Sequence, residues 1–212
     1  AQLRVPAHQK LQELENRPGF VGVLLEAYAD SAAAPQGRYL AILMCKNVVD
    51  RQWRPQQGKG MLPEDKRHTK QLLEKLLAGA VTGALPHLLE LTVVTRRVCR
   101  FDFPKEWDEL AHFLLAGLKG IREQGFSESG LCTIVVLHHV LKEQATKRLL
   151  SSRREFQQIA QVLTEPLGAV WVMALEQLRH ALAPGGPGSG DDRIWKLSRY
   201  LDGCFMILLA QG

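Results

Sequence analysis

The chain has 212 residues, 46% of them hydrophobic and 23% charged, so it can bury a substantial core and is not a disordered tail. Its 27 Lys and Arg against 22 Asp and Glu give a net charge of +5, too small an excess for a dedicated polyanion binder. The longest apolar runs, Leu167–Leu175 and Cys204–Ala210, fall short of the roughly 18 residues that a membrane-spanning helix needs.

The first residues show no secretory signal, and the start of the chain is expected to be a fragment boundary. The four cysteines are far apart and form no C-x-x-C pair, which fits a reducing compartment and buried, structural thiols. Apolar residues recur at helical spacing throughout, which predicts an all-α chain.

The pattern predicts a helix over Leu62–Thr82 with Pro63 in its first turn and an apolar stripe of Leu72, Leu73, Leu76, Leu77 and Ala80. The next helix, Leu85–Phe101, has two apolar faces, formed by Leu85, Leu88 and Leu89 and by Leu91, Val94 and Val98. Such a helix is expected to lie between two neighbours.

Pro104 is expected to begin the following helix, Pro104–Glu123, because proline disfavours helical geometry in the residue before it. The stripe of that helix is Trp107, Leu110, Leu114, Leu118 and Ile121. Ser127 and Gly130 are expected to open another helix, with the stripe Leu131, Ile134, Val135, His138 and Leu141.

A long helix is predicted from about Leu149 to Ala183, and Pro166 is expected to kink or divide it. The Gly- and Pro-rich segment 184–190 is predicted to be a flexible loop before a last helix, Asp191–Ala210. The apolar run Cys204–Leu209 is expected to need a partner that the chain does not supply, so we expect the natural protein to continue beyond Gly212.

The first helices of successive pairs are expected near Gln36, Ala84 and Ser129, close to the ~40–47-residue period of HEAT and armadillo units. The sequence therefore predicts a right-handed α-solenoid of HEAT-type pairs. About four pairs are expected over residues 1–183, and the first helix of a following repeat over 191–212.

Patterns for chemistry are mostly missing. Gln57-Gly58-Lys59-Gly60 lacks the spacing of a phosphate loop, the adjacent His138 and His139 cannot chelate one metal as an i, i+4 pair would, and helix capping accounts for the carboxylates around Pro104. No catalytic residue, metal or cofactor is expected. The basic groups are interpreted as a solvated face, with RNA contact left open: Arg51, Arg54, Arg96, Arg97, Arg100, Lys147, Arg148, Arg153 and Arg154.

Several segments in order resemble the N-terminal domain of the importin-β (karyopherin-β) family. They are Leu11–Phe20 with its Pro18-Gly19-Phe20 turn, Arg38-Tyr39-Leu40-Ala41, Lys46-Asn47 followed by Trp53, Leu62–Lys66, and Asp102–Leu110 with Pro104 and Trp107. The segment Asp50–Arg54, the Lys147–Phe156 segment and the long helix holding Trp171 further resemble the importin-eleven branch. Met44-Cys45, the positive net charge and the loop through Gly190 depart from the family pattern.

The motif residues Pro18, Gly19, Phe20, Arg38, Lys46, Asn47, Trp53, Lys66, Pro104 and Trp107 are interpreted as mainly structural. Trp53 and Trp107 are expected to seal junctions between repeats, and a buried Asn47 to satisfy carbonyls at a helix end.

The resemblance implies a nuclear import receptor, not an enzyme, that binds the GTP form of Ran on the concave face formed by the second helices. It also implies cargo and nucleoporins as partners, a monomer without membrane insertion, and shuttling between nucleus and cytoplasm through the pore. The Ran contacts are expected among side chains off the apolar stripes: Lys70, Glu74, Glu109, His112, Gln157 and Gln158. An exportin-type receptor, a HEAT scaffold that does not bind Ran, and an RNA-binding solenoid remain as alternatives.

Overall fold

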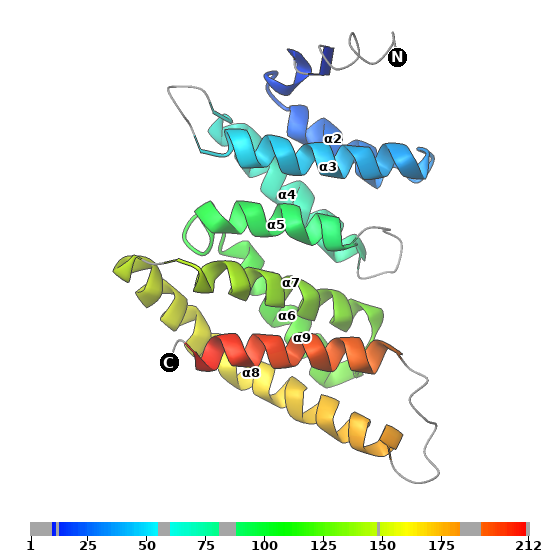
Figure 1. The fold of residues 1–212 in the computed structure, drawn as a ribbon, viewed down its shortest axis with the longest axis vertical. Coiled ribbons are helices and arrows are strands. Elements are labelled where there is room, and N and C mark those ends of the chain that lie inside the picture. The colour runs from blue at the N-terminus through cyan, green and yellow to red at the C-terminus, as the bar shows by residue number, and fades with distance from the viewer. Residues whose placement is uncertain are drawn as a thin grey trace.

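The computed structural model describes residues 10–11, 13–54, 60–80, 88–147, 149–182 and 192–210 (Figure 1). In these ranges the regular structure is helical and no strand occurs, which confirms the all-α prediction. The labelled helices are α2 (Phe20–Ala29), α3 (Pro35–Gln52), α4 (Pro63–Ala80), α5 (Leu88–Asp102), α6 (Glu109–Gln124), α7 (Glu128–Ala145), α8 (Leu150–Leu182) and α9 (Asp192–Leu209).

The helices form two layers. Helices α3, α5, α7 and α9 lie side by side in one layer, each in contact with the next (Figure 1). Helices α2, α4, α6 and α8 form a second layer behind it, in which α2 contacts α4 and α6 contacts α8. The stacking of antiparallel pairs is that of an α-solenoid, in which each pair buries its apolar faces against its neighbours.

Local signals in the sequence set several helix ends. Pro35 and Pro63 begin α3 and α4, where a missing N–H costs nothing. Ser127 caps α7, because its hydroxyl accepts a hydrogen bond of 3.2 Å from the N–H of Gly130. Gly125 ends α6 at a φ of 79°, a left-handed conformation that favours glycine.

The core runs continuously between the two layers. Trp53 and Trp107 are both fully buried, at the ends of successive repeats. The predicted α6 stripe is buried throughout: Trp107, Leu110, Leu114, Leu118 and Ile121. All four cysteines are buried free thiols, as predicted.

Three local predictions are wrong. Helix α6 begins at Glu109, because residues 103–106 form a turn and Pro104 lies inside it, so Pro104 does not begin the helix. Leu89 is 52% exposed, so the second apolar face of α5 is only partly covered. Asn47 is exposed in the body of α3 and satisfies no buried helix end.

Helix α8 continues through Pro166 without a break, so the expected division of this helix does not occur. Packing holds it on both sides of the proline, since Leu163, Leu167 and Val170 are buried. Its segment Leu150–His180 is also long and apolar enough to span a membrane, although the expectation was that no segment is. Only 22% of the apolar window in this segment is buried, and the helix packs against α6, α7 and α9.

The chain itself provides a partner for α9, contrary to the expectation for its apolar end. Leu201, Cys204 and Leu208 are buried, and the helix packs against α7 and α8. Only the opposite side of the run stays open, with Met206 67% and Leu209 71% exposed. The predicted loop 184–190 lies outside the described residues, as do Leu85, residues 57–59 of the Gly-Lys-Gly segment and Arg148.

Candidate functional site

Two of the predicted contact residues, Lys70 and Glu74, are taken up by contacts within the chain. The ammonium of Lys70 lies 3.3 Å from the Asp102 carboxylate and donates to the carbonyl of Glu106. The indole N–H of Trp107 donates to Oε1 of Glu74. Asp102 also accepts a 2.8 Å hydrogen bond from the indole N–H of Trp53, so this carboxylate joins three parts of the chain. Lys70 and Glu74 therefore close a junction and are not an open surface.

The other four predicted contact residues are exposed on the second layer. Glu109 and His112 lie on α6, and Gln157 and Gln158 lie on α8. Because the first layer covers the other side of these helices, their exposed stripes face away from it. An ion pair of 3.6 Å between Arg122 and Glu165 links the two helices on this side. Sequence reasoning missed the exposed stripe of the neighbouring α4, which carries Arg67, Gln71 and Lys75. We call the exposed sides of α4, α6 and α8 the second-layer face.

The motif residues at the N-terminal end hold the first helices together. Arg38 is buried, donates a 2.8 Å hydrogen bond to the carbonyl of Tyr28 and lies 5.9 Å from the centre of the Tyr28 ring. Lys66 lies 5.6 Å from the ring of Trp53. Gly19 precedes α2 with a φ of 77°, which the turn between Pro18 and Phe20 requires.

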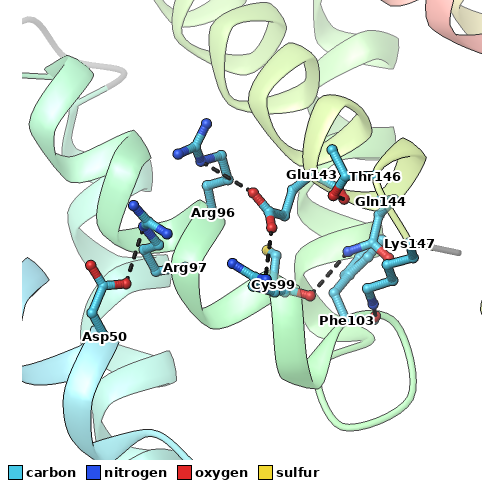
Figure 2. Close-up of polar contacts among 10 residues, drawn as sticks. Asp50, Arg96, Arg97, Cys99, Phe103, Glu143, Gln144, Thr146 and Lys147 are labelled. Atoms are coloured by element: carbon cyan, nitrogen blue, oxygen red, sulfur yellow. Dashed lines mark hydrogen bonds and ion pairs between the residues drawn. The ribbon is translucent and has the colours of Figure 1, made fainter.

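Polar residues also connect α3, α5 and α7 (Figure 2). The buried carboxylate of Glu143 on α7 lies 3.4 Å from Arg96 and 3.7 Å from Arg100, both on α5. Arg97 pairs with Asp50 of α3 at 3.1 Å. We call these residues the interhelix network. It fixes the spacing of three neighbouring first-layer helices.

The network continues to the end of α7. The side-chain amide of Gln144 donates a hydrogen bond of 3.0 Å to the carbonyl of Cys99 (Figure 2). The ammonium of Lys147 donates one of 3.2 Å to the carbonyl of Phe103 (Figure 2). Burial lowers the pKa of Lys147, partly offset by the nearby Glu155 carboxylate.

Two histidines lie between α7 and α9. The rings of His138 and His139 are 5.5 Å apart, and that of His138 is 5.4 Å from Tyr200. Burial, together with the charges of His138, Arg96 and Lys142, lowers the pKa of His139 to about 4. Burial also lowers the pKa of His138. Both rings are therefore neutral at pH 7 and pack as aromatic groups. Within the described residues no group of three or more His, Cys, Asp or Glu is placed to hold a metal ion.

Sequence comparison matches residues 7–78 to the family model described as Importin-beta N-terminal domain. The Schizosaccharomyces pombe protein named importin beta-like protein kap113 is 29% identical over 177 residues, which are 80% of this chain and 18% of that protein. Human Importin-11 is 28% identical over 170 residues, 78% of this chain and 16% of its own length. The chain thus spans less than a fifth of the length of these curated relatives.

Two solved structures share the fold. The structure of Lph2, described as a bidirectional nuclear transport receptor in S. cerevisiae, superposes with a TM-score of 0.79 at 20% identity, covering 97% of this chain and 19% of that one. The exportin Cse1 in its cargo-free, cytoplasmic state gives 0.69 at 18% identity, covering 96% and 20%.

The two-layered stack of helix pairs is a HEAT-type α-solenoid, and the prediction of that fold class is confirmed. The matched domain and the names of the curated relatives confirm the predicted resemblance of the chain to the importin-β family, near the importin-11 branch.

Proposed function

We propose that this chain is the Ran-GTP-binding region of a nuclear import receptor that shuttles between nucleus and cytoplasm. The observation that carries the proposal is an importin-β N-terminal domain whose second layer presents exposed polar stripes from α4, α6 and α8. For a full-length receptor of the size of these relatives, we further propose binding of cargo and of nucleoporins, and a monomeric state. The role is that of a binding protein, without catalysis.

The proposed contacts are the exposed residues of the second-layer face. They comprise Glu109, His112, Gln157 and Gln158, to which the geometry adds Arg67, Gln71 and Lys75. Lys70 and Glu74 contribute indirectly, because their bonds to Glu106, Asp102 and Trp107 fix α4 against the turn that precedes α6.

The direct experiment measures binding of this chain to Ran loaded with a non-hydrolysable GTP analogue and to Ran loaded with GDP. We expect clear binding of the GTP form and much weaker binding of the GDP form. Equal affinity for both forms, or binding of neither, would contradict the proposal and favour a HEAT scaffold that does not use Ran.

A double variant tests the position of the contact surface. Glu109→Lys with Gln158→Glu alters the charge of exposed positions on α6 and α8, and we expect Ran-GTP affinity to fall about tenfold. The matched control is Leu40→Lys, which changes the net charge equally at an exposed first-layer position of α3. An equal loss in both variants would remove these positions from the contact surface.

Transport in the opposite direction is the second candidate, because the two similar structures are described as a bidirectional receptor and an exportin. The test uses a full-length receptor that contains this chain, with a cargo protein bound to it. Release of that cargo on addition of Ran-GTP supports import, whereas tighter binding in its presence would assign the receptor to export.

A further inference from the structure

Two guanidinium groups lie over the Phe101 ring, and the ammonium of Lys147 binds the backbone two residues further on, at Phe103. The guanidinium of Arg54, just after α3, lies 4.9 Å from the centre of the ring, and that of Arg100 on α5 lies 6.0 Å from it. Lys147, just after α7, donates a hydrogen bond of 3.2 Å to the carbonyl of Phe103. Burial lowers the pKa of its ammonium, and the charge of Arg54 adds to that lowering. We call Arg54, Arg100 and Lys147 the cation cluster.

The acidic residues at this edge, Glu143 and Glu155, neutralise the cation cluster only in part. Glu143 is shared between Arg96 and Arg100, and its 3.7 Å separation from the half-exposed Arg100 is long. Glu155 pairs with Lys105 at 2.8 Å. Among the ion pairs of the described residues, none includes Arg54 or Lys147. A positive excess therefore remains at one place on the molecule.

Stabilisation of helix ends accounts for only part of this arrangement. Arg100 lies in the last turn of α5, where a cation complements the helix dipole. Arg54 instead lies beyond the end of α3 and stacks on an aromatic ring of another helix. Stacking holds its planar guanidinium in place and leaves the edge of the group, with its N–H donors, free to bind an anion.

We propose that the cation cluster binds a carboxylate-rich segment of a partner protein. Paired guanidinium groups match carboxylates because each can donate two parallel hydrogen bonds. The arrangement suits a peptide better than RNA, since single-strand binders offer aromatic faces on which bases stack. Phe101 is half-buried and carries two guanidinium groups. This surface belongs to the ends of α3, α5 and α7, so the inference is independent of Ran binding on the second-layer face.

The test uses the full chain and a fluorescein-labelled octaglutamate peptide, with octaglutamine as the uncharged probe, followed by fluorescence anisotropy at low salt. We expect octaglutamate to bind and octaglutamine not to bind. Arg54→Gln with Arg100→Gln should weaken octaglutamate binding about tenfold, because two charge-assisted contacts are lost. Ran-GTP affinity should stay unchanged in this variant.

The matched control is Arg17→Gln with Arg179→Gln, which removes the same charge at two exposed positions far apart in the sequence. This control should keep the peptide affinity within about twofold. Equal weakening of octaglutamate binding in both double variants would show that binding depends only on the net charge of the chain, and would overturn the proposal. Absence of octaglutamate binding would overturn it as well. Tighter binding of an oligouridylate, with loss in the same Arg54 and Arg100 variant, would replace the peptide with a nucleic acid.

The single variant Arg54→Gln separates loss of binding from loss of folding. We expect it to stay folded, because Arg54 takes part in no ion pair between the described helices. Two results together support the proposal: an unchanged circular dichroism spectrum and a loss of octaglutamate affinity of about threefold or more. A threefold loss is about half of the tenfold double-variant effect on a logarithmic scale. Unchanged affinity in this folded single variant would overturn it.

Discussion

Asp102, at the end of α5, interacts with two side chains of the preceding helix pair, α3 and α4. The indole of Trp53 and the ammonium of Lys70 both reach its carboxylate, and the adjacent turn places Trp107 against Glu74. Each tryptophan thus fills the core with its ring and satisfies its single N–H with a carboxylate, which a buried indole requires. A single-residue change here should act on the junction as a whole.

Trp107→Ala should lower the free energy of unfolding by about 3–5 kcal/mol, because it removes a fully buried ring and leaves Glu74 without its donor. Urea denaturation measures this loss. The control is Trp195→Ala on α9, a tryptophan that is 45% exposed and should cost less than about 1 kcal/mol. A loss below about 1 kcal/mol at Trp107 would contradict its burial.

Lys70→Glu should destabilise the chain by about 2–3 kcal/mol, because it replaces the cation beside Asp102 with a second carboxylate and removes the donor to Glu106. Both side chains of this ion pair are mostly buried, with 15% and 13% exposed, so solvent screens the pair weakly. Lys75→Glu, on the exposed stripe of the same helix, should stay within about 0.5 kcal/mol. Thermal unfolding of the two variants compares them, and equal midpoints would refute the assignment.

At the scale of the helix, close approach between neighbours depends on small residues. A Cβ at Gly117 of α6 would collide with the side chain of Thr133 on α7, whereas a Cβ at Gly120 of the same helix would meet nothing. The difference follows from which side of α6 packs against α7.

Gly117→Ala should therefore cost about 1–3 kcal/mol through overpacking, while Gly120→Ala should stabilise the chain by about 0.5–1 kcal/mol through helix propensity. Denaturant titration of the two variants checks both signs. A stabilising Gly117→Ala would mean that α6 and α7 are farther apart than described.

The contact between α7 and α9 should make stability depend on pH. The pKa of His139 is about 4 in the folded chain and near 6.5 when unfolded, so the unfolded state binds more protons between these values. Stability is therefore fully present above pH 6.5 and falls as the pH decreases towards 4. His139→Gln should flatten that decrease in the melting temperature, and His112→Gln, an exposed position, should not. Identical pH profiles for the two variants would contradict this account.

The element scale also explains how far the sequence could predict the structure. Periodicity predicted the helices well because burial of one side dominates their pattern, as in α6. The prediction that Lys70 lies on an open surface is wrong. Periodicity alone places it near the core side, because Lys70 and Leu77 are seven residues apart and project only about 20° apart on a helix. The polar type of Lys70 suggested an open surface, while its direction pointed to the core side.

Contacts made by distant segments could not be predicted from local patterns. Nothing near Lys70 or Arg54 in the sequence indicates Asp102 or Phe101, which lie more than thirty residues away. The persistence of α8 through Pro166 is also a tertiary effect, because packing on both sides outweighs one missing hydrogen bond.

At the scale of the whole molecule, the interhelix network adds polar contacts between neighbouring repeats to the apolar packing between them. Glu143→Gln keeps the shape of the side chain but removes the charge that Arg96 and Arg100 share. Hydrogen exchange should rise in α5 and α7 and change little in α2, because stability in a solenoid propagates between neighbours. Glu123→Gln, in an exposed pair with Lys119, is the control. A uniform rise along the chain would show that the network acts on global stability alone.

Helix α8 has a mechanical consequence for the molecule. Its 33 residues give a rod about 50 Å long, against about 27 Å for the 18-residue helices beside it. Pro166 is the central residue of this rod, and it leaves the carbonyl of Val162 without its donor. The helix therefore lacks one backbone hydrogen bond at its midpoint, while as a whole it packs against α6, α7 and α9. We expect any bending of α8 to concentrate at this turn, because a missing hydrogen bond at a proline is a usual site of helix kinks.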